Sequence, residues 1–158
     1  MISVDPGTGG TGYAVWKGNQ LKNYGTIHFH SNCETWEQKM KDIGLKFLDM
    51  LRDNKPAHTI VMESPVFMRG TGGYMVASAG DLCKLAMLTG HLAARVYDRF
   101  IGTQLTLVEP SKWKGQLPKN VVARRVQNLI PSIDFKSLRI SNHAMDAIGI
   151  GLWRIGVL

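Results

Sequence analysis

The stretch that decides the fold is Ile2-Ser3-Val4-Asp5-Pro6-Gly7-Thr8-Gly9-Gly10-Thr11-Gly12-Tyr13-Ala14-Val15-Trp16. Its short apolar run predicts a buried strand that ends on a carboxylate, and a glycine-rich turn then leads into a second strand. Because glycine permits positive φ and close backbone approach, the turn leaves room for a ligand beside Asp5. Asp5 is therefore either a metal ligand or a turn residue whose side chain bonds its own backbone.

The composition is that of a globular protein with a basic charge balance. Lys and Arg number 19 against 12 Asp and Glu, which gives a formal net charge of +7. A chain of 158 residues is long enough to bury a substantial core, and we expect a single domain over 1–158. The excess of positive charge favours a polyanionic partner, most simply nucleic acid, although it also fits a protein that is merely basic.

Cysteine usage and hydropathy indicate the cellular setting. Cys33 and Cys83 stand far apart without zinc-type spacing, so we expect both to be reduced and Cys83 to lie in the core. No signal-peptide pattern is visible, and no apolar run approaches the roughly 18 residues of a membrane span. We therefore expect a cytoplasmic protein with no membrane partner.

Hydrophobic periodicity predicts an α/β protein with five strands and five helices. The expected strands are about 2–5, 11–17, 20–29, 58–63 and 104–109, and the expected helices about 31–54, 74–100, 111–114, 120–130 and 141–153. Ser31 and Glu34 have the spacing of a capping box at the start of the first helix. The second helix carries a stripe of mostly small residues, which suits close packing of another helix, either within the domain or across a dimer.

Three more acidic residues occupy positions where a charge needs a partner. Glu63 ends a second buried strand, and burying it there is costly unless it is paired or bound to a metal. Asp146 lies inside an apolar run of the last helix, three residues after His143 and on the same helix face. Asp146 also suits a favourable interaction with the helix dipole. Glu109 ends a strand too, but it can equally serve the N-terminus of the helix that follows.

Asp5, Glu63 and Asp146 converge if the two strands are neighbours and the last helix packs against them. Three carboxylates are hard ligands that suit Mg²⁺ or Mn²⁺ rather than zinc. Two such ions about 3.5–4 Å apart can activate water and hold the leaving oxygen of a phosphodiester. Together with the basic charge balance, this predicts a nuclease.

Two segments are candidates for contacts with nucleic acid. Phe67, Met68 and Arg69 head a glycine-rich loop directly after the Glu63 strand, and an aromatic beside an arginine suits stacking on unpaired bases and binding of phosphate. Phe67 is alternatively a core anchor for this loop. A later segment concentrates positive charge, as a phosphate-contacting face or a merely solvated one would. Its basic residues are Lys112, Lys114, Lys119, Arg124 and Arg125.

The order of these motifs resembles the RuvC-like Holliday junction resolvases of the ribonuclease H-like superfamily, and looks most like their small phage-encoded branch. The resemblance covers nearly the whole chain. It rests on Asp5-Pro6-Gly7 with Thr11-Gly12-Tyr13-Ala14, Ile60-Val61-Met62-Glu63 with Phe67-Met68, Lys84-Leu85 with Gly90, Pro110 with Trp113-Lys114, Leu117-Pro118-Lys119, Val126-Gln127, and His143-Ala144-Met145-Asp146-Ala147-Ile148.

The resemblance implies a ribonuclease H-like fold, with a five-stranded mixed sheet flanked by helices. The first three strands of that sheet are antiparallel. It implies a homodimer that nicks four-way DNA junctions symmetrically during recombination and repair, in the host cytoplasm if a phage encodes it. The implied metal ligands and catalytic residues are Asp5, Glu63, His143 and Asp146, around two Mg²⁺ or Mn²⁺ ions. Many members carry an aspartate where this chain has His143. Phe67 matches the junction-probing aromatic of the family, and Lys114 a DNA-contacting lysine.

Other functions share parts of this pattern. Sugar-kinase and actin-like ATPases also place Asp-x-Gly-Thr after a first strand, but they need two such domains, so we expect no nucleotide cofactor. A related nuclease that acts on other branched DNA or on RNA is a closer alternative, since fold does not determine substrate. A junction-binding protein without catalytic activity is the third, although such a protein has no need for carboxylates beside DNA phosphates.

Overall fold

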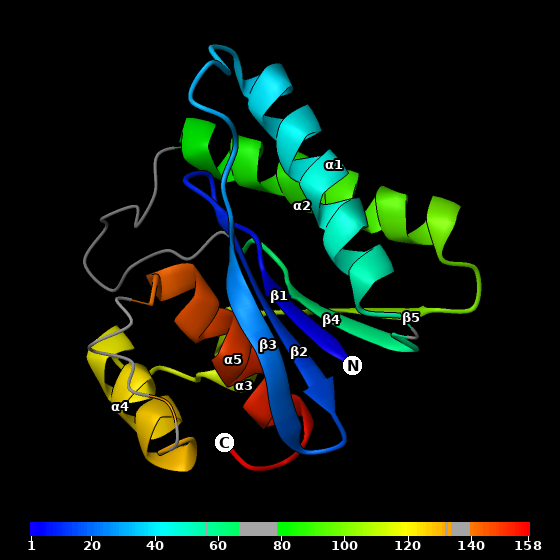
Figure 1. Ribbon diagram of the computed structural model, residues 1–158. Coiled ribbons are helices and arrows are strands. Elements are labelled where there is room, and N and C mark those ends of the chain that lie inside the picture. The colour runs from blue at the N-terminus through cyan, green and yellow to red at the C-terminus, as the bar shows by residue number, and fades with distance from the viewer. Residues whose placement is uncertain (56, 67–78, 132, 134–139) are drawn as a thin grey trace.

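The computed structural model describes residues 1–55, 57–66, 79–131, 133 and 140–158 (Figure 1). Its strands are β1 (Ile2–Asp5), β2 (Thr11–Lys17), β3 (Gln20–Ile27), β4 (Thr59–Glu63) and β5 (Gln104–Val108). Its helices are α1 (Trp36–Asp53), α2 (Ala79–Arg99), α3 (Pro110–Trp113), α4 (Lys119–Leu129) and α5 (Asn142–Arg154). No helix in this described part of the chain is long and apolar enough to cross a membrane.

The strands form one mixed sheet in the order β3-β2-β1-β4-β5. β1, β2 and β3 pair antiparallel, whereas β4 runs parallel to β1 and β5 parallel to β4. The expected α/β fold with a five-stranded mixed sheet is confirmed. Because β1 and β4 are parallel neighbours, Asp5 and Glu63 end adjacent strands at the same edge of the sheet.

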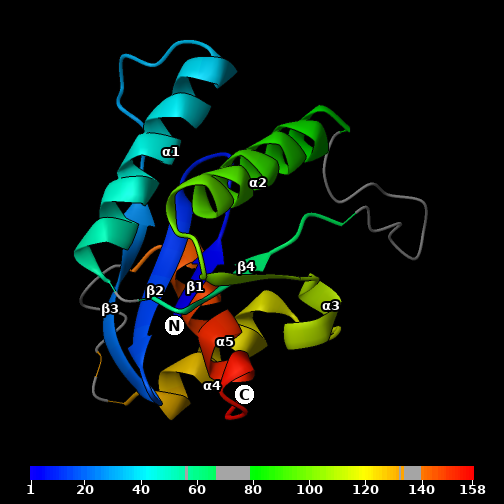
Figure 2. The same cartoon turned by 90° about the vertical axis from the view of Figure 1, so that its right-hand side faces the viewer.

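Helices cover both faces of the sheet: α1 and α2 lie on one side, and α5 with α3 and α4 on the other (Figures 1 and 2). Side chains alternate between the two faces along a strand. Ile2, Val4, Ile60 and Met62 accordingly pack in the core beneath α1 and α2, whereas Val61 packs in the core around α5. The same alternation points Asp5 and Glu63 toward the α5 face.

Some expected boundaries and environments are wrong. The residue that caps α1 is Thr35 rather than Ser31. The Thr35 hydroxyl accepts from the amide of Gln38 at 3.3 Å, and the Gln38 side chain accepts from the amide of Thr35 at 3.3 Å, which completes the capping box. β3 ends at Ile27, two residues short of the expected end. Cys83 is exposed rather than in the core, since its row on α2 faces away from the sheet. The expected start of α2 at 74 lies outside the described residues.

Candidate active site

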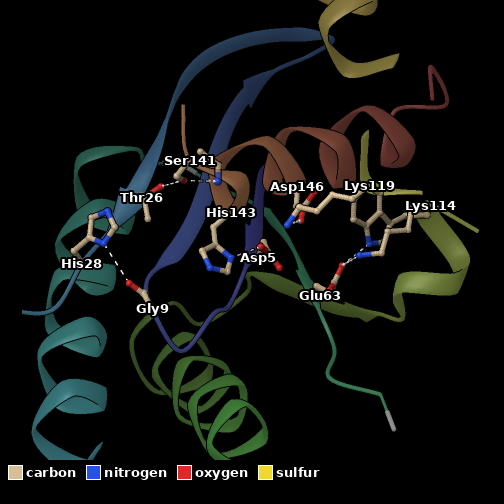
Figure 3. Close-up of polar contacts among 12 residues, drawn as sticks. Asp5, Gly9, Thr26, His28, Glu63, Lys114, Lys119, Ser141, His143 and Asp146 are labelled. Atoms are coloured by element: carbon tan, nitrogen blue, oxygen red, sulfur yellow. Dashed lines mark hydrogen bonds and ion pairs between the residues drawn. The ribbon is translucent and has the colours of Figure 1, made fainter. Parts of the chain in front are cut away.

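The N-terminus of α5 is docked on the sheet so that its first turn reaches the end of β1. Ser141 caps the helix by accepting a hydrogen bond from the amide of Ala144 at 3.1 Å, and its hydroxyl also bonds that of Thr26 on β3 (Figure 3). A Cβ at Gly12 would overlap the backbone carbonyl of His143, so glycine is needed at that position of β2. This close approach brings His143 and Asp146 to the carboxylates of the sheet.

Asp5 is hydrogen-bonded to His143. The side chain of Asp5 is only 7% exposed, and His143 Nδ1 lies 2.8 Å from Asp5 Oδ2. Burial raises the pKa of Asp5, and the bond to Asp5 raises the pKa of His143. Gly7 also makes room for this ring, since a Cβ there would overlap the imidazole. The glycine turn that we expected to accommodate a ligand therefore accommodates a side chain of the protein.

Glu63 is held by two residues at the end of α3. The indole N–H of Trp113 donates to Glu63 Oε2 at 2.6 Å, and Lys114 Nζ lies 3.7 Å from the same oxygen. Burial, followed by the negative charge of Asp5, raises the pKa of Glu63 to about 7. Glu63 therefore titrates near neutral pH, as catalytic and metal-binding carboxylates often do.

Asp146 is buried on α5 and pairs with a lysine from another helix. Its side chain is 12% exposed, and Lys119 Nζ, at the start of α4, lies 3.4 Å from Asp146 Oδ2. The negative charge of Asp146 raises the pKa values of both Asp5 and Glu63, so the three carboxylates face one another electrostatically. Each of the three has a basic partner, as Figure 3 shows: His143 for Asp5, Lys114 for Glu63 and Lys119 for Asp146.

The four predicted ligands suit a hard divalent cation in their chemistry. They comprise three mutually repelling carboxylates and one imidazole, and a cation among them would relieve the repulsion that raises the pKa of Glu63. Within the described ranges, no three His, Cys, Asp or Glu side chains are arranged as a ligand set around one ion. Each carboxylate is instead paired with a basic side chain. The residues therefore fit a metal site in kind, and metal ligation by them stays a prediction.

The predicted basic segment lies beside this cluster but does not act as one unit. Lys114 and Lys119 reach the carboxylates. Lys112 on α3 and Arg124 and Arg125 on α4 are exposed. Phe67, Met68 and Arg69 lie outside the described residues, so their predicted contacts stay predictions. Glu109 is exposed ahead of α3 and has Ser111 as its hydrogen-bond partner, which separates it from the cluster.

The contact of Trp113 with Glu63 was not predicted from the sequence. Trp113 was expected as part of a short helix and as a motif residue of the resemblance, and no spacing relates it to Glu63, 50 residues earlier. The available signal was its position directly before Lys114 in the segment that follows β5.

No protein-family model matches the sequence, and no curated protein matches it either. Solved structures do. RuvC of T. thermophilus in complex with a Holliday junction substrate matches with a TM-score of 0.69 and 20% identity, over 99% of this chain and 98% of that one. A second Thermus thermophilus RuvC structure matches with a TM-score of 0.65 and 19% identity, over 99% of this chain and 98% of that one.

The yeast mitochondrial Holliday junction resolvase Ydc2 matches with a TM-score of 0.62 and 19% identity, over 97% of this chain and 78% of that one. The likeness runs through nearly the whole chain and comprises the mixed sheet with its flanking helices. It confirms the resemblance inferred from the motifs at the level of fold. The chain has the fold of the RuvC-like Holliday junction resolvases.

Proposed function

We propose that this protein is a metal-dependent endodeoxyribonuclease that resolves four-way DNA junctions by symmetric nicking of paired strands. The observation that carries the proposal is the convergence of Asp5, Glu63 and Asp146, with His143, on the α5 face of a resolvase-type sheet. A carboxylate cluster of this kind repels DNA unless cations stand between the two. A phosphodiester-cleaving metal site provides those cations.

The proposed ligands are Asp5, Glu63, His143 and Asp146, around two Mg²⁺ or Mn²⁺ ions. When bound, such ions supply an activated water and stabilise the departing 3′ oxygen. Asp5 and Glu63 contribute rigidity, because each ends a buried strand whose backbone is held in the sheet. Asp146 and His143 share one helix face and are positioned together by the docking of α5.

DNA is bound, in this proposal, by the basic residues beside the cluster and by the loop after β4. Lys112, Lys114, Lys119, Arg124 and Arg125 contact phosphates, and Arg69 adds to them. Phe67 stacks at the opened junction centre next to Met68. Lys114 and Lys119 pair with carboxylates in the DNA-free protein, so they must exchange those carboxylates for phosphates as DNA binds. A twofold junction requires a twofold enzyme, and we propose a homodimer.

The outward face of α2 supports the homodimer. One row of exposed residues recurs at helical spacing and is mostly small or apolar; it comprises Cys83, Ala86, Met87, Gly90, Ala94 and Tyr97. Met87 and Tyr97 are 50% and 63% exposed, and a Cβ at Gly90 would meet nothing. We expect the wild type to sediment as a dimer and Met87→Glu as a monomer, because the interface would bury the unpaired charge of the glutamate. A dimer that survives both Met87→Glu and Gly90→Glu would place the interface elsewhere.

The test of the activity compares three DNAs of matching sequence: a mobile four-way junction, a fork and a linear duplex, each with Mg²⁺ and with Mn²⁺. Paired symmetric nicks confined to the junction support the proposal. Cleavage of the junction and the fork alike would extend the substrate to branched DNA in general. Tight junction binding without cleavage in either metal would make the protein a junction binder and contradict the proposal.

A further inference from the structure

We propose that Trp113 is a positioning residue for Glu63: its indole N–H fixes one oxygen of the carboxylate and leaves the other for a metal ion. This inference rests on the proposed function, since it assigns Glu63 as a ligand. The contact is short, 2.6 Å from Nε1 to Oε2, and it joins α3 to the end of β4. No spacing rule in the sequence and no charge attraction explains the pairing.

The ring itself is held in place. Trp113 is 4% exposed and belongs to the core around α5, with Val122, Ala147 and Ile148. It sits against α5 where a glycine makes room, since a Cβ at Gly149 would stand 2.7 Å from Trp113 Cζ3. A larger residue at position 149 would push the ring away from Glu63. The direction of the N–H is therefore set by the core and not by a flexible side chain.

Trp113 and Lys114 approach the same oxygen of Glu63. The indole N–H donates to Oε2 and the ammonium forms an ion pair with it at 3.7 Å, and in the described part of the chain no hydrogen bond or ion pair engages Oε1. The two donors differ in charge. An ammonium competes with a metal cation for a carboxylate, whereas the neutral indole N–H can stay bonded while the carboxylate ligates. Trp113 therefore suits the metal-loaded site, whereas Lys114 moves away from Glu63 when a metal ion binds.

A simpler role has to be separated from this one, because any buried indole N–H needs an acceptor. Trp16 is the matched control. It is also 4% exposed, its N–H donates to Ser3 Oγ at 2.9 Å, and it also lies against an α5 glycine, Gly151. Its acceptor is a core hydroxyl and not a cluster carboxylate. Trp16→Phe and Trp113→Phe therefore remove the same group from comparable sites.

The experiment measures Mn²⁺ binding to the DNA-free protein by calorimetry, with thermal unfolding of each variant alongside. We expect both variants to lose thermal stability to a similar extent. Trp113→Phe alone should weaken Mn²⁺ binding, by roughly tenfold or more, as loss of a hydrogen bond to a ligating side chain typically does. Equal Mn²⁺ affinity in Trp113→Phe and the wild type would overturn the inference and leave the proposed function standing. No Mn²⁺ binding by the wild type would overturn both.

A second measurement covers the case in which Trp113→Phe does not fold. The indole N–H signals of the wild-type protein are followed by NMR during a Mg²⁺ titration, after each signal has been assigned through the backbone of its own tryptophan. We expect the Trp113 signal to shift as Mg²⁺ binds, because the carboxylate that accepts its hydrogen bond takes up a cation. The Trp16 signal should stay unchanged. If the Trp113 signal stays unchanged while the site fills, Trp113 does not act through Glu63.

Discussion

Asp5 and Asp146 belong to the same carboxylate cluster, but their basic partners are held in different ways. His143 bonds Asp5 from a helix whose N-terminus is fixed on the sheet by Gly12 and by the Ser141–Thr26 contact. Lys119 reaches Asp146 from the first residue of α4, and its side chain is 59% exposed. One partner is a partly buried side chain on a helix that is fixed to the sheet, and the other is a surface side chain that can turn to solvent or to DNA.

The difference indicates how basic partners can stabilise three buried acids and still give way to a metal ion. The imidazole can lose its charge by losing a proton. The charge attraction to Asp5 then ends while the ring stays in place. The ammonium of Lys119 must instead move away before a metal can take its place. Under the proposed function, we therefore expect proton concentration to govern metal binding at Asp5, and phosphate to govern it at Asp146.

The largest effect is expected at Asp5 itself. Asp5→Asn keeps the size of the side chain but removes the charge that we assign to metal binding. We expect cleavage of four-way junctions to fall below detection while junction affinity in gel-shift assays stays close to that of the wild type. Lys114 and Lys119 stay in place in this variant, and their ion pairs are with Glu63 and Asp146. Loss of junction binding together with cleavage would assign Asp5 to the fold or to DNA contact instead.

The next effect concerns pH on the His143 side. The hydrogen bond to Asp5 raises the pKa of His143, so below that pKa the imidazolium holds Asp5 and opposes a metal ion. We expect Mn²⁺ affinity, measured by calorimetry, to rise as pH rises through a value above the ordinary 6.5 of histidine, by about tenfold per unit on the acid side. His143→Asp should move this dependence to lower pH. An unchanged pH profile in His143→Asp would show that another group governs it.

The elements that carry the acids follow from hydrophobic patterns in the sequence. The short apolar runs before Asp5 and Glu63 predict buried strands that end on a carboxylate, and the structure has β1 and β4 there. The apolar run around Asp146 predicts a helix, and the structure has α5 there. These elements were predictable because such patterns are local properties of the chain.

The partners of the acids were not predictable in the same way. Trp113 with Glu63 and Lys119 with Asp146 are pairings across separate elements, determined by how α3 and α4 pack on the sheet. The start of α1 was also predicted wrongly, because Ser31 with Glu34 and Thr35 with Gln38 both have the spacing of a capping box, and the structure uses the second pair. The glycine-rich turn was expected to leave room for a ligand beside Asp5, whereas the docking of α5 brings the His143 ring against Gly7.

A moderate effect is expected on the lysine side. Lys119→Met removes the ammonium that competes for Asp146, so the DNA-free protein should bind Mn²⁺ more tightly, by roughly fivefold for a loss of about 1 kcal/mol of repulsion. The same variant should bind junctions more weakly, with a salt slope smaller by about one. Lys112→Met is the control, because Lys112 is exposed and forms no ion pair with these carboxylates. Equal gains in Mn²⁺ affinity for both variants would reduce the effect to overall charge.

The smallest effect is a change in stability that needs no ligand. Burial raises the pKa of Glu63 from 4.5 to about 7, so the folded protein holds this proton more tightly than the unfolded chain does. The ionised carboxylate therefore costs stability as pH rises from about 4.5 to about 7, and that cost is fully present above pH 7. Glu63→Gln accepts the Trp113 hydrogen bond through its amide oxygen without a charge.

We expect Glu63→Gln to unfold at a temperature a few degrees higher than the wild type at pH 8, equivalent to roughly 1–3 kcal/mol. The two proteins should unfold together near pH 5, where Glu63 is largely protonated in the folded state. Saturating Mg²⁺ should reverse the order at pH 8, because only the wild type retains the carboxylate that takes up the ion. If Glu63→Gln is less stable than the wild type at pH 8 without metal, the attraction of the Glu63 carboxylate to Lys114 outweighs the cost of burying its charge.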